Sequence, residues 1–243
     1  MDKARERLIF ALDVDSLDEA RGWVARLHGQ VGIFKIGKQL FTRCGPEVVH
    51  MVREQGGEVF LDLKYHDIPN TVAMAGVEAL RLGVRIFNVH ALGGPEMMAR
   101  LVAEVDKHAP RGTPGRPLLL AVTILTSSTD ATLKALGIDR PVAEMVPRLA
   151  KLAKDAGMDG VVASPQEVGL IRKVCGADFA IVTPGVRPAT ASLDDQQRVM
   201  TPFEALRAGA DYLVIGRSIS AAPDPAAAAA AIVAEMQAAL AGS

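Results

Sequence analysis

Several features that mark common protein classes are missing from this 243-residue sequence. Only two cysteines occur, Cys44 and Cys175, and neither belongs to a C-x-x-C pair, which argues against a disulfide framework and a structural zinc site. The five histidines show no H-x-x-x-H or H-x-H spacing, so no transition-metal site is visible in the sequence. We therefore expect reduced thiols and no bound metal.

An excess of charge of one sign and a long hydrophobic run are missing too. The 27 basic and 28 acidic residues give a formal net charge of −1, so no overall field attracts nucleic acid or an anionic membrane. No stretch reaches the roughly 18 apolar residues of a membrane helix, and the opening MDKARERLIF does not read as a secretory leader. We expect no nucleic-acid partner, no membrane association and a cytoplasmic location.

Short apolar runs rich in β-branched residues recur along the whole chain. Near-continuous apolar runs are typical of strands that are buried on both faces of a parallel sheet. The eight runs are IFALDV from Ile9, GIFKIG from Gly32, EVFLDLK from Glu58, IFNVHA from Ile86, LLLAVTIL from Leu118, DGVVAS from Asp159, FAIVTPG from Phe179 and YLVIGRS from Tyr212. They predict eight buried strands.

Helix signals lie between these runs. Ser16 and Glu19 have the spacing of a capping box, Pro46 stands at a helix start, and the alanines of 226–231 favour a last helix. Eight strand and helix units in 243 residues average about 30 residues each, the size of a βα unit. The sequence therefore predicts an α/β fold, a (β/α)8 TIM barrel, with a single domain over residues 1–243.

A doubly wound open sheet is the alternative arrangement of alternating strands and helices. The first run continues as ALDVDSLDEA, where the dinucleotide-binding version of that sheet would carry G-x-G-x-x-G. The loops richest in glycine, proline and polar residues, 108–117 and 187–195, fall between units and mark no domain boundary. The barrel is the favoured fold.

Polar side chains stand at or just after the ends of the apolar runs. In a TIM barrel these strand ends face the active site, and charges at buried strand ends are costly unless they are paired or used. The residues at these ends are Asp13, Lys35, Asp62 with Lys64, His90, Thr126, Ser164, Arg187 and Arg217. The sequence therefore predicts an active site at this end of the barrel.

The densest polar group is DLKYHDIPNT, residues 62–71. Asp62 and Lys64 are two apart on a strand and point to the same face, and Lys35 on the second strand adds a positive charge to the same mouth. We expect an array of alternating lysines and carboxylates, in which a protonated lysine can act as a general acid. Asp67 either joins this array or caps the helix that follows, and its spacing leaves both interpretations open.

Two late segments have the composition of a phosphate clamp, TPGVRP at 183–188 and IGRSIS at 215–220. Loops after the seventh and eighth strands are the usual phosphate site of this fold. Gly185 and Gly216 permit close approach of the backbone, and Arg187 and Arg217 supply forked donors. Both pairs together favour a phosphate site over an ordinary turn with a surface charge.

These segments carry a family resemblance. FALDV, FKIG, the D-x-K-x-x-D-I-P-N-T block, TPGVRP, D-Q and IGRS resemble the bacterial orotidine 5′-phosphate decarboxylases, in the family's order and over nearly the whole chain. The resemblance implies a cofactor-independent carboxy-lyase that converts orotidine monophosphate to uridine monophosphate and CO2, the last step of de novo pyrimidine nucleotide biosynthesis. It also implies a homodimer.

The resemblance further implies roles for single residues. Lys64 becomes the proton donor, Asp62 lies beside the substrate carboxylate, and Asp67 reaches into the site of the other subunit. The remaining contacts that it implies are Asp13 and Lys35 with the ribose hydroxyls, Ile68 and Thr71 with the substrate, Thr126 with the pyrimidine, Gln196 with base and phosphate, and Arg187, Gly216 and Arg217 with the phosphate.

Two other functions stay open at this point. A magnesium-dependent phosphosugar decarboxylase or aldolase of the same superfamily shares the D-x-K-x-x-D pattern, but this sequence has Lys35 where such enzymes are expected to carry an acidic metal ligand. A noncatalytic nucleotide-binding module would keep the phosphate clamp, since fold alone does not fix function. The Lys35, Asp62 and Lys64 set disfavours the module, which needs no buried carboxylate aimed at an anionic ligand.

Overall fold

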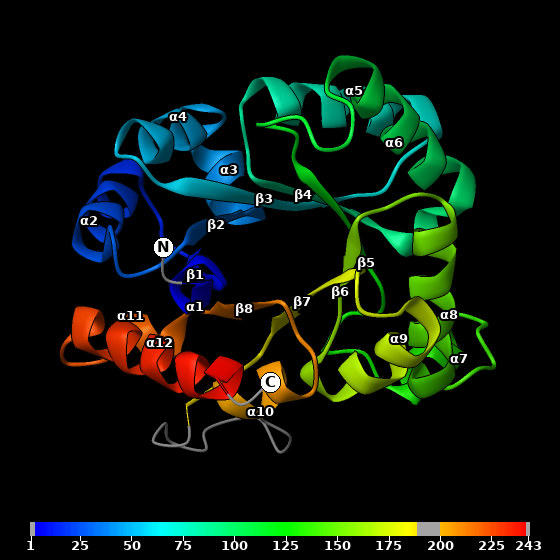
Figure 1. The fold of residues 1–243 in the computed structure, drawn as a ribbon. Coiled ribbons are helices and arrows are strands. Elements are labelled where there is room, and N and C mark those ends of the chain that lie inside the picture. The colour runs from blue at the N-terminus through cyan, green and yellow to red at the C-terminus, as the bar shows by residue number, and fades with distance from the viewer. Residues whose placement is uncertain (1–2, 189–199, 242–243) are drawn as a thin grey trace.

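The computed structural model describes residues 3–188 and 200–241. Eight parallel strands close into a barrel in the order β1 to β8, with β8 paired to β1 (Figure 1). The strands are β1 Leu8–Leu12, β2 Ile33–Gly37, β3 Glu58–Tyr65, β4 Ile86–His90, β5 Leu118–Val122, β6 Gly160–Val162, β7 Ala180–Pro184 and β8 Tyr212–Ile215. The predicted TIM barrel and all eight predicted strands are confirmed, while the domain range 1–243 extends over undescribed segments and stays a prediction.

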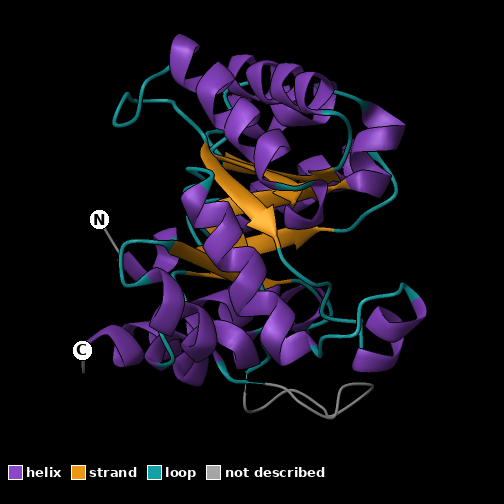
Figure 2. Cartoon of the chain, turned by 90° about the vertical axis from the view of Figure 1, so that its right-hand side faces the viewer, coloured by secondary structure: helices purple, strands orange, loops and turns teal. Residues whose placement is uncertain are grey.

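Helices surround the strands on the outside of the barrel (Figures 1 and 2). They are α1 Lys3–Glu6, α2 Leu17–Leu27, α3 Lys38–Cys44, α4 Glu47–Glu54, α5 Pro69–Arg81, α6 Pro95–His108, α7 Asp130–Ala135, α8 Val142–Asp155, α9 Val168–Cys175, α10 Pro202–Arg207, α11 Arg217–Ser220 and α12 Pro225–Ala241, with short 3-10 turns η1 Ala91–Gly93 and η2 Pro165–Glu167. In the part of the chain that the structure describes, no helix combines the length and apolarity that crossing a bilayer requires.

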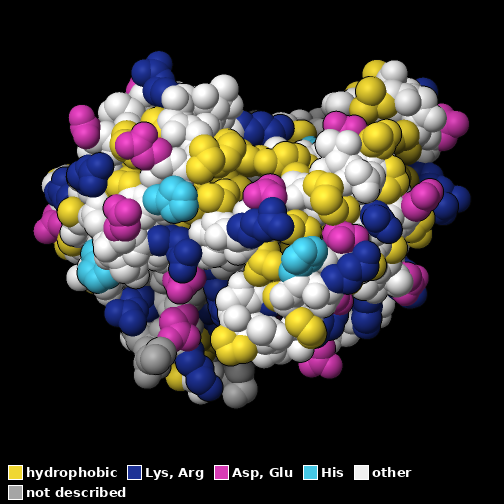
Figure 3. Space-filling view, turned by 90° about the horizontal axis from the view of Figure 1, so that it is seen from above, with side chains coloured by type: hydrophobic (Ala, Val, Ile, Leu, Met, Phe, Trp, Pro, Cys, Tyr) yellow, Lys and Arg dark blue, Asp and Glu magenta, His cyan; other side chains and the backbone are white. Residues whose placement is uncertain are grey.

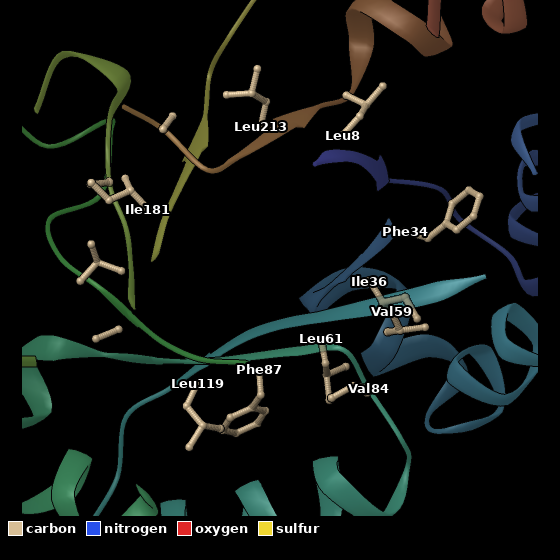
Figure 4. Packing of buried hydrophobic residues seen from close by; sticks show 14 of the residues in the cluster. Leu8, Phe34, Ile36, Val59, Leu61, Val84, Phe87, Leu119, Ile181 and Leu213 are labelled. Atoms are coloured by element: carbon tan, nitrogen blue, oxygen red, sulfur yellow. The ribbon is translucent and has the colours of Figure 1, made fainter. Parts of the chain in front are cut away.

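Alternation along the strands divides the buried side chains into two layers. One set packs outward against the helices and includes Phe34, Leu61, Phe87 and Leu119 (Figure 4). The other set fills the barrel interior and consists of Ile9, Ala11, Ile33, Phe60, Ile86, Leu120, Val122, Val162, Val182 and Val214. The interior is therefore a packed core, and any ligand has to bind at an end of the barrel.

Of the two hydrogen bonds in the capping box predicted for Ser16 and Glu19 at the start of α2, one is present and the other has a different donor. The Ser16 hydroxyl accepts the Glu19 N–H at 3.2 Å, as in a capping box. The Glu19 carboxylate, however, accepts the N–H of Asp15 rather than that of Ser16. Two further helices were not predicted, namely α3, which follows β2 directly, and α7, which interrupts the connection from β5 to α8.

Two carboxylates tie strands together at the base of the barrel, the end at which the strands begin. Asp159 precedes β6 and accepts the Leu119 N–H at the start of β5 at 2.8 Å, and it also pairs with Arg116 at 2.8 Å. Asp211 precedes β8 and accepts the Ile181 N–H at the start of β7 at 2.8 Å. Each carboxylate thereby supplies an acceptor where the ladder of the neighbouring strand begins.

Arginine side chains complete these two base networks. The Arg172 guanidinium donates to Asp211 at 2.6 Å and to the backbone carbonyls of Gly176, Phe179 and Gly209. Such forked donors fix several chain segments at once.

Candidate active site

Charged side chains of β2, of β3 and of the residue that follows β1 meet at the mouth, the end at which the strands finish. The Lys35 ammonium lies 3.3 Å from Asp13 Oδ1 and 3.5 Å from Asp62 Oδ2. The Lys64 ammonium lies 2.6 Å from Asp62 Oδ1. These four residues line a cavity of about 180 Å³ together with residues of α3. The structure thus brings the predicted Lys35, Asp62 and Lys64 into one contiguous array.

Asp62 is the buried centre of this array, with 8% of its surface exposed. Burial by itself raises the pKa of this carboxyl, but the ammonium groups of Lys35 and Lys64 and hydrogen bonds from Lys64 and Asn88 outweigh burial and lower the pKa below its usual value. Asp62 is therefore an anion at neutral pH, held in a site where charge interactions are stronger than in water.

Lys64 has an unusual backbone. Among the described residues it alone, apart from glycines, has a φ in the left-handed region, 53°. A long side chain in that conformation is uncommon, and such strain is often found at functional sites. The pairing of β3 with β4 shifts register between Leu61 and Tyr65, so Lys64 lies in an interruption of the ladder.

Asn88 on β4 is a site residue that our reading of the sequence missed. It is completely buried, donates from Nδ2 to Asp62 Oδ1 at 2.7 Å, and accepts the Lys64 N–H at 2.9 Å. The signal was present in the run IFNVHA, where alternation from the inward-facing Ile86 places a polar side chain inside the barrel.

Asp67 lies in the exposed loop between β3 and α5. Its carboxylate accepts the N–H of Ile68 at 2.6 Å, and among the described residues no ion pair within 4.0 Å joins it to Lys35 or Lys64. The N-cap of α5 is Ile68, without a side-chain cap, so the reading of Asp67 as the capping residue is wrong. The alternative interpretation, in which Asp67 joins the array of Lys35, Asp62 and Lys64, is not seen within one chain either. Ile68 and Thr71 are exposed beside it.

The opposite side of the mouth, after β5, β6 and β7, is an open groove. It has a volume of about 850 Å³ and is lined by Thr126, Ser164 and Gly185 among others. β5 ends at Val122, so Thr126 stands four residues beyond the strand rather than at its end. Thr123 takes the position after the strand and is buried with its hydroxyl donating to Val162 O.

The two predicted phosphate segments begin side by side, because β7 and β8 pair with Pro184 opposite Val214. Gly185 has a φ of 79°, a conformation that favours glycine. A Cβ on Gly216 would lie 3.3 Å from the Cβ of Ala11, so this position is tight. Arg217 is exposed at the start of α11, and the Arg187 N–H donates to Met200 O at 3.1 Å. Gln196 and the 189–195 part of the loop 187–195 lie outside the described residues.

His90 ends β4 next to the array and packs against His66, with the ring centroids 5.9 Å apart. Burial, His66 and the nearby lysines lower the pKa of His90, so its ring is neutral at pH 7. Within residues 3–188 and 200–241, no three His, Cys, Asp or Glu side chains are grouped so that they could hold a metal ion.

Comparison with known proteins identifies the family. A model described as "Orotidine 5'-phosphate decarboxylase / HUMPS family" matches residues 6–232. The chain belongs to this family. The orotidine 5'-phosphate decarboxylase of Syntrophotalea carbinolica is 66% identical over 238 residues, which are 98% of each chain. That of Geobacter sulfurreducens is 63% identical over 237 residues, again 98% of each chain.

A solved structure agrees with these relatives. Orotidine 5'-phosphate decarboxylase from Lactobacillus acidophilus has a TM-score of 0.83 and 39% identity to this chain, and the match covers 94% of this chain and 98% of that one. The family description contains two names, but these relatives bear the decarboxylase name. The comparisons therefore support neither the magnesium-dependent phosphosugar enzyme nor the noncatalytic module.

Proposed function

We propose that this chain is an orotidine 5′-phosphate decarboxylase, a carboxy-lyase that forms uridine monophosphate and CO2 without a cofactor. The observation that carries the proposal is the Lys35, Asp62 and Lys64 array around a cavity at the mouth of the barrel. Full-length relatives at 63–66% identity with that name support it.

Lys64 is the proposed proton donor. When the C6–carboxylate bond breaks, CO2 leaves and the electron pair stays on C6, where no adjacent carbonyl delocalises it. Because the Lys64 ammonium is already fixed in place, it stabilises the negative charge on C6 without any reorganisation of solvent. One of its N–H groups then donates a proton to C6. The 2.6 Å contact with Asp62 holds the ammonium in place, so the chain's own side chains supply what a cofactor supplies elsewhere.

Asp62 is proposed to lie beside the substrate carboxylate. Two anions about 4 Å apart at an effective dielectric near 20 repel by about 4 kcal/mol. That energy equals about three powers of ten in rate. It is too small to account for the reaction by itself, so we assign the remainder to Lys64 and to binding energy from the phosphate.

The other predicted contacts divide between the two sides of the mouth. Asp13 directly follows β1 and Lys35 is the third residue of β2, and we assign the ribose hydroxyls to this pair. Thr126 lines the opposite groove, where we place the pyrimidine. Arg187, Gly216 and Arg217 belong to the two adjacent loops to which we assign the phosphate, and Gln196 is proposed to bridge base and phosphate.

We also propose a homodimer in which Asp67 completes the site of the partner, with Ile68 and Thr71 beside it. Asp67 is exposed, and its neighbour Ile68 is 66% exposed. Met74 on α5 and Leu92 on η1 add apolar surface, and Figure 3, a view from the side of α5 and α6, has hydrophobic side chains exposed among charged ones. Exposed apolar surface of this kind is typical of a protein interface.

One assay tests substrate, reaction and metal independence together. Chelator-treated protein is incubated with orotidine monophosphate, and the loss of orotate absorbance is followed. We expect turnover that added magnesium does not change. Turnover that requires magnesium would favour the phosphosugar class, and tight binding of uridine monophosphate without turnover would favour the noncatalytic module. Cell fractionation tests the cytoplasmic location that we propose for this activity.

A further inference from the structure

We infer that Asn88 is a positioning residue that sets the geometry of both Asp62 and Lys64 through one amide group, an inference that rests on the proposed function. Asn88 belongs to β4, whereas both of its partners belong to β3. Its Nδ2 lies 2.7 Å from Asp62 Oδ1, and its Oδ1 lies 2.9 Å from the backbone nitrogen of Lys64. It touches neither lysine ammonium in any hydrogen bond of the described residues, so it acts through its neighbours.

The amide can take only one orientation. The Asp62 carboxylate is an acceptor and the Lys64 N–H is a donor, so a flipped amide would set oxygen against oxygen and N–H against N–H. An isosteric apolar side chain would satisfy neither group, and a carboxylate would satisfy only one of them. Complete burial of Asn88 keeps water from replacing the missing partner.

The backbone of β3 explains why this side chain is needed. Leu61 pairs with Phe87 and Tyr65 with Val89, so three residues of β3 stand opposite Asn88 alone. The strand ladder cannot give each of them a backbone partner, and Lys64 enters the left-handed region with a φ of 53°. The Asn88 side chain accepts the N–H that this bend turns away from the ladder.

The same amide fixes the carboxylate of Asp62. Oδ1 receives Lys64 Nζ at 2.6 Å and Asn88 Nδ2 at 2.7 Å, which leaves Oδ2 facing Lys35 Nζ at 3.5 Å. Each oxygen is therefore directed to one lysine. Without the amide, the carboxylate is free to rotate and the Lys64 backbone to relax, and both changes move the ammonium that the proposed reaction uses.

The test compares Asn88→Ala with Ile86→Val, a matched change at the next inward position of the same strand, which contacts neither Asp62 nor Lys64 in any hydrogen bond. Misplacing a reacting group by an ångström costs about 100-fold in rate, so kcat of Asn88→Ala should fall by about that factor while KM changes less than about threefold. Ile86→Val should keep kcat.

A second variant gives a signature that a merely structural role would not produce. In Asn88→Asp the introduced carboxyl group, when protonated, can donate to Asp62 and accept from Lys64 as the amide does, but when ionised it cannot donate. Its kcat relative to the unchanged protein should therefore rise as the pH falls. If Asn88→Ala does not fold, this pH profile decides alone.

Two results would overturn the inference, namely kcat of Asn88→Ala within about threefold of the unchanged protein, or a ratio of Asn88→Asp to unchanged kcat that does not vary with pH. Failure of the proposed function is a separate result, because the unchanged protein would then not turn over orotidine monophosphate at all.

Discussion

The base and the mouth of the barrel both contain ion pairs with little exposure to solvent, but the positively charged side chains have different partners at the two ends. At the base, the Arg172 guanidinium donates hydrogen bonds to Asp211 and to several backbone carbonyls, so it links separate segments of the chain. At the mouth, Lys35 and Lys64 contact carboxylates of the same small cluster and face a cavity. In barrel enzymes polar groups at the base serve stability and those at the mouth serve chemistry.

The base and the mouth also differ in their backbone hydrogen bonding. The base carboxylates Asp159 and Asp211 accept the N–H of the second residue of β5 and of β7, and so satisfy donors near the start of regular ladders. At the mouth the ladder of β3 is interrupted and Lys64 is held in a left-handed conformation. The mouth therefore contains a strained backbone conformation, whereas the donors near the strand starts at the base are satisfied. Lower stability at a functional site is expected in natural proteins.

The largest expected effect is that of Lys64→Ala on turnover. Removing the proton donor should lower kcat by several powers of ten. The free energy of unfolding should fall by only about 1.5–3 kcal/mol, because Asp62 keeps Lys35 and Asn88 as partners. Steady-state kinetics and urea unfolding measure the two quantities. If the variant retains more than about a tenth of kcat, the assigned role of Lys64 is wrong.

A mixing experiment tests whether the mouth, unlike the base, depends on a second chain. Inactive Lys64→Ala and Asp67→Ala subunits should form mixed dimers in which one site carries both lesions and the other carries neither. With random exchange, half of the dimers are mixed, so about a quarter of all sites should be active. If activity stays at background although native mass spectrometry shows subunit exchange, Asp67 serves its own subunit.

Arg217→Ala should have an intermediate effect that is confined to the phosphate side of the mouth. A hydrogen bond to a charged group contributes about 1.5–3 kcal/mol, so KM should rise about 10- to 100-fold. Orotidine without its phosphate is the control substrate. An equal loss of activity toward that substrate would mean that Arg217 acts on another part of the ligand.

At the base, Asp159→Ala should change stability and not chemistry. Arg116, whose side chain is only 7% exposed, loses Asp159 but keeps Asp106 at 2.9 Å, so the cost is that of a hydrogen bond between charged groups, about 1.5–3 kcal/mol. The free energy of unfolding should fall by that amount in urea, while kcat of the folded protein stays the same. A fall in kcat at constant stability would contradict the division of roles between base and mouth.

The sequence predicted the barrel and the array because both follow from local patterns. Apolar runs mark strands buried on both faces, and the two-residue spacing of Asp62 and Lys64 places them on one face. The register shift opposite Asn88 has no local signature, since it depends on how β3 pairs with β4. The end of β5 at Val122, four residues before Thr126, was likewise not marked within the apolar run LLLAVTIL.

The smallest expected effect is on the pH dependence of the free energy of unfolding, and it arises at the mouth rather than at the base. Burial, His66 and nearby lysines lower the pKa of His90 in the folded protein, whereas an unfolded histidine titrates near pH 6.5. As the pH falls below about 6.5, the unfolded chain therefore binds a proton that the folded chain does not, and stability decreases. His90→Asn removes this difference, so its free energy of unfolding should depend less on pH between about 5 and 7. The base variant Asp159→Ala should keep the steeper dependence, since His90 is intact in it. Urea unfolding at several pH values measures both slopes. If His90→Asn and the unchanged protein have the same slope, His90 does not stay neutral at the mouth.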